Sequence, residues 1–469
     1  MDSNRGQRLA EQVKRFRARF VQSVGSVLGD VIPSKLLMEW AMEEVGVWRE
    51  RVYSPFTTLV LFLEQVLGAD HSCQDAVARA LSARVADGQT PCSLNTGPYC
   101  KARARLPVEL LERLGRETGA RVCAQQPAGW LWHGRQVKLV DGSTVSMPDT
   151  AANQKRFPQN RSQKTGLGFP LARLVAIVSL SCGSVLDWAV GPCQGKETGE
   201  TALLWSLAQK LQPGDVVVAD RAYAGYFMIA WLIQQGVDVV IRQHQRRHTD
   251  FRRGQQLGAR DHLVPWMRPQ RPTWMSESIY ASMPESLTMR EARVAGWTLA
   301  STLIDPQQVN KRELFALYRQ RWHVELDLRS IKNVMQMDLL RCKSPEMVEK
   351  EIAAHLVGYN LVRAVMAQAA SLSAVLPRQL SFKTALQILN AFEQNLRCCP
   401  RGLHASRHAF VLGGIAQARL PNRPGRVEPR VVKRRPKPRA LLTKPRQALQ
   451  KGLRRKQQSI QKQIDQGLR

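Results

Sequence analysis

The stretch from Tyr318 to Lys332, YRQRWHVELDLRSIK, contains no Pro or Gly and is rich in good helix formers, so it is predicted to form one helix. At about 100° per residue, four polar side chains fall within roughly 60° of one another: Tyr318, Arg321, Glu325 and Lys332. A neighbouring face is apolar and can pack on a sheet. A lone Glu among basic residues is usually a solvated ion pair. The polar stripe therefore acquires a functional meaning only from other parts of the chain.

The whole chain is strongly basic. Its 469 residues include 69 Lys and Arg against 38 Asp and Glu, which gives a formal charge of +31 at pH 7. Such a charge favours polyanions, with nucleic acid as the first candidate and an anionic membrane surface as the second. No apolar run is long enough to span a bilayer, and no apolar signal region opens the chain. We therefore expect no membrane partner and a cytoplasmic, nucleoid-associated protein.

The pattern of apolar residues changes along the chain and predicts four regions. Residues 1–125 are expected to be a helical domain, whose basic residues suit DNA binding or a plain helical bundle equally. Residues 130–345 alternate between strands and helices, and the stretch 243–296 interrupts them as a β-rich insertion. Residues 346–416 are again helical and apolar. The basic, Pro-rich tail 417–469 is expected to be disordered without a partner and to bind phosphate backbones.

Two aspartates stand at the ends of predicted strands in the middle region. The order there is three strands, helix, strand, helix, strand, which is the order of a ribonuclease H-like α/β core. Asp141 ends the first strand and Asp220 ends the fourth. Strand ends in α/β sheets are where ligands and active sites collect. The long helix that carries Glu325 can lie against the same sheet.

Three carboxylates at about 3–4 Å from one another would repel strongly unless a cation lay between them. Mg²⁺ suits such a site because it uses few carboxylates and leaves positions for substrate phosphate, and Mn²⁺ is a chemically similar substitute. Two ions about 3.5–4 Å apart would support phosphoryl transfer. Taken singly, Asp141 also fits a simple turn, and Asp220 fits a surface pair with Arg221.

Three stretches together resemble an insertion-sequence DDE transposase of the insertion sequence 4 family. KLVDGSTVSMPD, from Lys138, resembles the first-aspartate motif of that family, and GDVVVADRAYAGY, from Gly214, resembles the second. The third stretch matches the Tyr-Arg-Glu-Lys signature of the family at every spacing: Tyr318, Arg321, Glu325 and Lys332. The resemblance covers roughly residues 130–345.

The resemblance implies roles for six residues. The catalytic, metal-binding residues would be Asp141, Asp220 and Glu325. The residues that contact phosphates of the element end, next to the cleavage site, would be Tyr318, Arg321 and Lys332.

A tryptophan is a further candidate for DNA contact. In the related transposon 5 transposase, a Trp at the end of the insertion stacks on a flipped base, and the same interval to the signature Tyr identifies Trp297 here. The alternative is that Trp297 simply opens a core strand. Trp266 and Trp274 are the next candidates, and Trp322 could stack on DNA or support its helix.

The resemblance implies a DNA transposase that binds terminal inverted repeats, cleaves the element ends and joins them to target DNA. Its partner would be double-stranded DNA, both element ends and target, and the synaptic complex would contain at least a homodimer. The apolar region 346–416 is the candidate for part of that interface. Two alternatives remain open: an inactive or domesticated sequence-specific DNA-binding protein, and a ribonuclease H-like nuclease without strand transfer.

Overall fold

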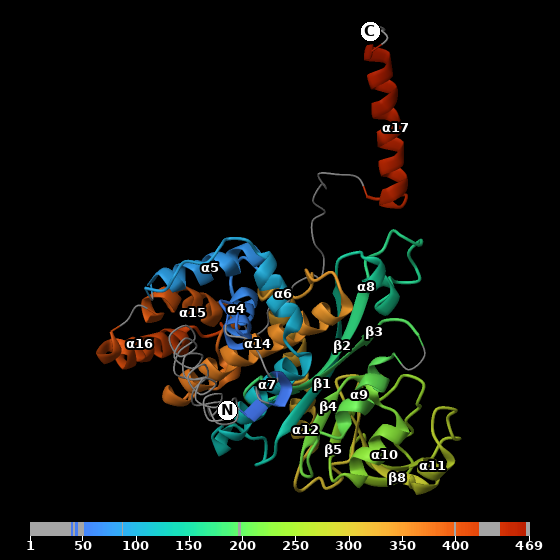
Figure 1. Ribbon diagram of the computed structural model, residues 1–469. Coiled ribbons are helices and arrows are strands. Elements are labelled where there is room, and N and C mark those ends of the chain that lie inside the picture. Colours follow the sequence, from blue (N-terminus) through green and yellow to red (C-terminus); the bar gives the residue numbers. More distant parts are fainter. Residues whose placement is uncertain are drawn as a thin grey trace.

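The structure is a computed structural model of the chain (Figure 1). It describes residues 39–40, 43–45, 51–86, 88–195, 198–397, 400–421 and 441–465. Most of the basic N-terminal segment and residues 422–440 of the tail lie outside the described residues. In the part of the chain that the structure describes, no helix is both long and apolar enough to cross a membrane.

One nine-stranded sheet runs through the molecule in the order β3-β2-β1-β4-β5-β9-β8-β7-β6. Its first five strands are β1 (Val137–Ser146), β2 (Leu171–Ser179), β3 (Val185–Pro192), β4 (Val216–Ala219) and β5 (Asp238–Arg242). β1, β2 and β3 pair antiparallel, whereas β4 pairs parallel with both β1 and β5. These strands are runs of Val, Leu, Ile and Ala, which suit a sheet that helices cover on both faces.

The β-rich stretch 243–296 does not form a separate sheet. It contains β6 (Gln255–Gly258), β7 (Asp261–Met267), α11 (Glu277–Ser282) and β8 (Ser286–Val294). The next strand, β9 (Trp297–Ser301), pairs antiparallel with both β8 and β5. The strands of the insertion therefore continue the hydrogen-bonded sheet of the core.

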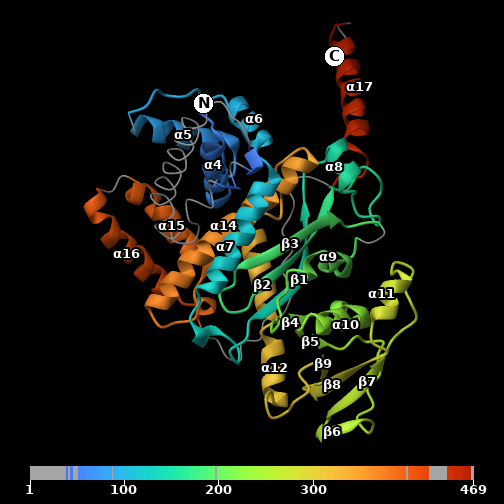
Figure 2. The same ribbon diagram turned by 60° about the horizontal axis from the view of Figure 1, so that its bottom comes forward.

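Helices cover the two faces of the sheet and enclose two apolar cores (Figure 2). On one face lie α9 (Glu200–Ala208) and α10 (Tyr226–Gln234). On the other face lie α7 (Val108–Ala124) and the long α14 (Pro345–Leu372). The remaining helices around α14 are α4 (Pro55–Leu67), α5 (Cys73–Ala86), α6 (Gly97–Arg105), α15 (Phe382–Arg397) and α16 (His404–Gln417). Most of α14 is buried, so its apolar composition is explained by packing within the chain.

The prediction of one helix over 318–332 is wrong. α12 (Lys311–Arg319) ends before Gln320, α13 (Trp322–Arg329) follows, and a π-helical turn occupies Ser330–Val334. α12 contacts β5, whereas α13 contacts β1. The break therefore lets each short helix bury its own apolar side chains against a different strand.

The prediction of a disordered tail is wrong for its last part. Residues Arg446–Asp465 form α17, whose described side chains are all exposed (Figure 1). This segment contains no Pro and is rich in Gln, Lys, Arg and Leu, all good helix formers. The Pro-rich composition that suggested disorder belongs to the residues before it.

Candidate active site

The three predicted catalytic carboxylates lie on three elements that meet at one place. Asp141 lies within β1, Asp220 directly follows β4, and Glu325 lies in the first turn of α13. The parallel ladder pairs Leu139 with Val218, so Asp141 and Asp220 follow at equivalent positions just beyond it. Because α13 packs on β1, it brings Glu325 to the same region.

Arg321 joins two of these carboxylates. Its Nη1 donates to Oδ2 of Asp141 at 3.3 Å, and its Nη2 donates to Oε1 of Glu325 at 2.5 Å. The side chains of Arg321 and Asp141 are each 18% exposed, so these contacts are partly shielded from water. The guanidinium of Arg321, for which the family resemblance implies a phosphate contact, therefore binds protein carboxylates in this structure.

The charges of the three carboxylates affect one another. Burial raises the pKa of Asp141 to about 6, and the charges of Asp220 and Glu325 add to this rise. The Gly142 backbone N–H, which donates to Asp141 at 2.8 Å, and the Arg321 guanidinium both act in the opposite direction. Asp220 and Glu325 therefore both lie within electrostatic range of Asp141.

The donor set fits a hard divalent ion, with one condition. Carboxylate oxygens are the ligands that Mg²⁺ and Mn²⁺ use in proteins. Yet no group of three His, Cys, Asp or Glu side chains is arranged to hold a metal ion within the described ranges. The Arg321 guanidinium stands between Asp141 and Glu325, where its positive charge substitutes for that of an ion. An ion shared by these two carboxylates therefore requires Arg321 to release them.

Tyr318 and Trp297 lie side by side near this cluster. Tyr318 is buried, and the nearby charges of Arg321 and Asp220 influence its pKa, which burial raises. The ring of Trp297 is 39% exposed, and its centroid lies 6.1 Å from that of Tyr318. The guanidinium carbon of Arg242 lies 5.1 Å from the Trp297 centroid. Trp297 is thus a partly exposed aromatic residue at the start of β9, beside α12.

The other residues singled out in the sequence are placed differently. Lys332 lies, partly buried, in the π-helical turn that follows α13. Trp322 is exposed and begins α13. Trp266 is a core residue whose Nε1 donates to Glu291 at 2.8 Å, so the structure rules it out as a base-stacking candidate. Trp274 packs against Trp205 of α9, with 5.9 Å between the ring centroids.

A buried ionic network holds α13 in place. Asp327, two residues after Glu325, is fully buried and accepts hydrogen bonds from Arg378 at 2.6 and 2.7 Å. It also accepts from Arg363 at 2.5 Å and from the Tyr359 hydroxyl at 2.9 Å. These partners come from α14 and the short helical turn Pro377–Gln379. The position of Glu325 therefore depends on the C-terminal helical region.

Sequence reasoning missed Asp327 and also Glu200, the first residue of α9. A single acidic residue in a helix gives no signal of burial or of its partners. Glu200 also gives no sequence signal of its own. The only related sequence feature is the glycine after Asp141, because Gly142 leaves room for the Glu200 carboxylate beside β1 once the chain is folded.

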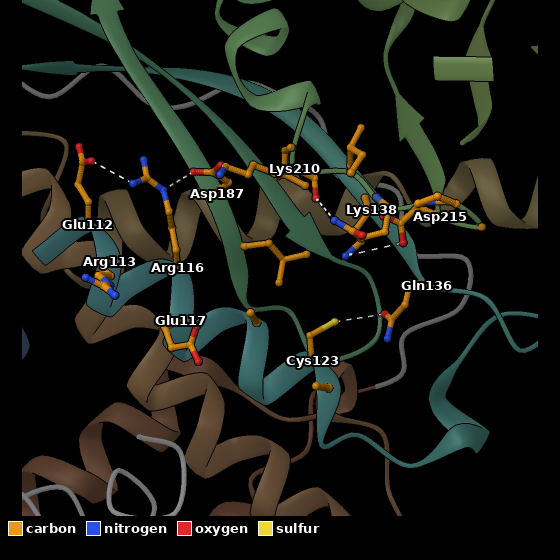
Figure 3. A pocket seen from close by; sticks show the side chains of 18 of the residues that line it. Glu112, Arg113, Arg116, Glu117, Cys123, Gln136, Lys138, Asp187, Lys210 and Asp215 are labelled. Carbon is orange, nitrogen blue, oxygen red and sulfur yellow. Dashed lines mark hydrogen bonds and ion pairs between the residues drawn. The ribbon is translucent and has the colours of Figure 1, made fainter. Parts of the chain in front are cut away.

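A cleft of about 980 Å³ lies at the opposite end of β1 and β4, between α7 and the sheet (Figure 3). Its charged residues largely pair with one another. Arg116 binds Asp187 at 2.6 Å, and Lys138 approaches Asp215 at 3.9 Å. None of the predicted catalytic or DNA-binding residues lines it. The carboxylate cluster, not this cleft, is the candidate active site.

Comparison with known proteins points to transposases. Residues 132–361 match the family described as the transposase DDE domain. The chain is 28% identical over 354 residues to the transposase InsG for insertion sequence element IS4 of Escherichia coli (strain K12), covering 70% of this chain and 76% of InsG. It is 31% identical over 68 residues to the transposase for insertion sequence element IS421 of Escherichia coli, covering 14% of this chain and 18% of that relative.

Among solved structures, the synaptic complex of piggyBac transposase with hairpin DNA is similar with a TM-score of 0.41 and 9% identity, over 87% of this chain and 86% of the other. The matched region contains Asp141, Asp220, Glu325 and the Tyr-Arg-Glu-Lys signature. By these matches the chain resembles DDE transposases of the insertion sequence 4 family.

Proposed function

We propose that this protein is a transposase that binds the terminal inverted repeats of an insertion sequence, cleaves the element ends and joins the freed 3′-hydroxyls to target DNA. The observation that carries the proposal is that Asp141 and Glu325 share the Arg321 guanidinium while Asp220 lies at the equivalent position of the neighbouring strand, within electrostatic range of Asp141. The strand order β3-β2-β1-β4-β5, with β4 and β5 parallel to β1, supports a ribonuclease H-like catalytic core.

Asp141, Asp220 and Glu325 would hold divalent ions, with Mg²⁺ preferred and Mn²⁺ as a substitute. Bound there, the ions would activate a water or 3′-hydroxyl and neutralise charge at the scissile phosphate. Before DNA binds, Arg321 reduces the repulsion between Asp141 and Glu325 by lying between them. A DNA phosphate would then compete for the guanidinium, whose fork of donors matches phosphate oxygens. In this way Arg321 would exchange one anionic partner for another.

Three further residues would position the DNA. The Tyr318 hydroxyl would donate a hydrogen bond to a phosphate beside Arg321. Lys332 would contribute a positive charge from the π-helical turn that follows α13. Trp297 would stack on a displaced base, because its side chain is partly exposed to solvent and packs beside Tyr318. The net charge of +31 would bring the DNA to this surface and keep the protein associated with the nucleoid.

Two element ends must be held together for transposition, so the active complex would contain at least a homodimer. The apolar character of region 346–416 no longer supports an interface there, because most of α14 is buried within the chain itself. The proposal of a dimer is therefore supported only by the requirement that two element ends be held together.

The substitution Glu325→Gln tests the proposal. It retains the shape of the side chain but removes the charge, so nicking of end DNA and strand transfer of a pre-cleaved end should each fall at least about a hundredfold. Binding to end DNA should persist. Glu313→Gln in α12 is the matched control, because a Gln side chain retains the acceptor of the capping box with Asn310.

Three outcomes separate the candidate functions. Full cleavage by the Glu325→Gln variant in Mg²⁺ would refute the catalytic assignment. Specific binding of ends by the unaltered protein, with no nicking in Mg²⁺ or Mn²⁺, would favour an inactive DNA-binding protein. Nicking without use of a 3′-hydroxyl as nucleophile would favour a nuclease.

A further inference from the structure

The carboxylate of Glu200 lies directly against β1, next to Gly142, the residue that follows Asp141. Glu200 is the first residue of α9 and is half-buried. A Cβ atom added to Gly142 would lie 2.5 Å from Cδ of Glu200 and 2.6 Å from its Oε1. Any side chain at position 142 would therefore collide with the Glu200 carboxylate, and glycine permits the close approach.

The start of α9 is also tied to the turn that carries Asp220. The Thr201 hydroxyl donates to the carbonyl oxygen of Ala222 at 3.4 Å. The backbone N–H of Ala222 in turn donates to Oδ1 of Asp220 at 2.7 Å. Glu200 is thus held between the strand that carries Asp141 and the turn that carries Asp220.

A buried hydroxyl faces the same space. Tyr223, at the end of the Asp220 turn, is only 3% exposed, and its hydroxyl has no hydrogen-bond partner among the described residues. Burial raises the pKa of Tyr223, and the charges of Glu200, Asp141 and Asp220 add to the rise. Glu200 is the strongest of the three influences, although the two groups are not placed for a well-formed hydrogen bond. A buried hydroxyl without a partner indicates a water or ion beside it.

The charges are unbalanced on this side of the site. Asp141 and Glu325 share the Arg321 guanidinium, whereas Glu200 forms no ion pair with any described residue. A partly buried carboxylate without a cation is unfavourable. Side chains of consecutive residues in a strand point to opposite faces, so Gly142 and Glu200 lie on the α9 face while Asp141 points toward α13.

We propose that Glu200 is a fourth carboxylate of the divalent-cation site, which it approaches from the α9 face of the sheet while Glu325 approaches from the α13 face. The Tyr223 hydroxyl would donate to Glu200 or to a water in the site. This inference rests on the proposed function, because it assigns Glu200 to the same ions as Asp141, Asp220 and Glu325. The competing explanation is that Glu200 only stabilises the N-terminus of α9 through the helix dipole.

Binding of Mn²⁺ alone to the full-length chain without DNA tests the inference, measured by electron paramagnetic resonance of the free ion. Glu200→Gln should weaken Mn²⁺ binding at least about tenfold, because it replaces a charged ligand with a neutral group of the same shape. Glu277→Gln is the matched control and should change nothing, because Glu277 is the exposed first residue of α11. Asp141→Asn is measured in parallel as a reference for the site.

The outcomes distinguish this inference from the proposed function. If Asp141→Asn weakens Mn²⁺ binding and Glu200→Gln does not, Glu200 is not part of the ion site and the inference is overturned. If neither substitution changes Mn²⁺ binding, the proposed catalytic site itself is wrong. If Glu200→Gln fails to fold, Glu200→Asp provides the test, since it keeps the charge but shortens the side chain. Weaker Mn²⁺ binding by that variant supports the inference, and unchanged binding overturns it.

Discussion

Arg321 acts as an internal counter-ion between two carboxylates. It binds Asp141 and Glu325 at once, in a partly buried position where their repulsion would otherwise be poorly screened by water. The same guanidinium occupies the space between these two carboxylates. We therefore expect Arg321 to stabilise this cluster and to compete with any cation that binds both carboxylates.

Arg321→Ala should separate these two effects. Without the guanidinium, the carboxylates repel, so the melting temperature of the metal-free protein should fall. Mn²⁺ should bind more tightly, by about tenfold if releasing Arg321 costs about 1.4 kcal/mol. Thermal unfolding with and without Mn²⁺ measures both effects. Arg319→Ala is the control, because Arg319 is exposed at the end of α12, and it should change neither the melting temperature nor Mn²⁺ binding. Weaker Mn²⁺ binding by Arg321→Ala would show that Arg321 does not compete with the ion.

At the residue scale, the sequence allowed three carboxylates to be selected because two were predicted at the ends of apolar strands and one lies in a spaced signature. Asp220 does follow β4, whereas β1 continues beyond Asp141 to Ser146. The structure places Asp220 and Glu325 within electrostatic range of Asp141, while the catalytic roles of all three stay predictions. Glu200 could not be selected in the same way. An acidic residue at a helix start is common for reasons of helix electrostatics alone, and its nearness to Gly142 arises only when α9 packs on the sheet.

At the scale of elements, α13 is too short to be stable by itself, because isolated helices below about 12–15 residues are marginal in water. Its position must come from tertiary contacts, and the buried Asp327 network provides them. The sequence pattern indicated helical character over 318–332 correctly. It could not indicate the break, because the break is set by where β1 and β5 lie beneath the two halves.

Asp327→Asn should strongly destabilise the protein. The substitution removes the negative charge but leaves Arg363 and Arg378 buried, which typically costs about 3–5 kcal/mol of unfolding free energy. Urea unfolding monitored by circular dichroism measures the change. Asp250→Asn is the control, because Asp250 forms a similar two-bond pair with Arg252 at the surface, where such pairs contribute little. Equal stability of the two variants would contradict the assigned role of Asp327.

At the scale of the whole molecule, positive charge is concentrated in parts that are outside the sheet. α17 exposes six cationic side chains and no acidic one among its described side chains: Arg446, Lys451, Arg454, Arg455, Lys456 and Lys462. A helix that makes no extensive contact with the sheet can reach DNA at a distance from the active site. It would contribute affinity through phosphate contacts without affecting the chemistry.

Deletion of residues 446–469 should therefore flatten the salt dependence of DNA binding. Each lost phosphate contact reduces the slope of log K against log salt by about 0.9, so loss of all six described cations would change it by about 5. Fluorescence anisotropy with duplex DNA at several salt concentrations measures the slope. The double substitution Leu449→Gln and Leu453→Gln retains the charge and should leave the slope unchanged. A slope that the deletion does not alter would show that α17 makes no contact with DNA.

The alternation of strands and helices in the middle of the chain was predictable, because each element carries its own periodicity. The joining of the insertion to the core sheet was not. β9 meets β5 after more than fifty intervening residues, and no local pattern indicates which distant strand a given strand will pair with.

The continuous sheet has a mechanical consequence. Backbone hydrogen bonds join β5 to β9 at the residues just after Trp297, and β5 is bonded to β4, which ends at Asp220. The distance between the aromatic ring and the carboxylates is thus set by the rigid spacing of neighbouring strands, with no hinge between them. If Trp297 stacks on a displaced base as proposed, the bending and unpairing needed to span this distance would come from the DNA and not from movement within the sheet.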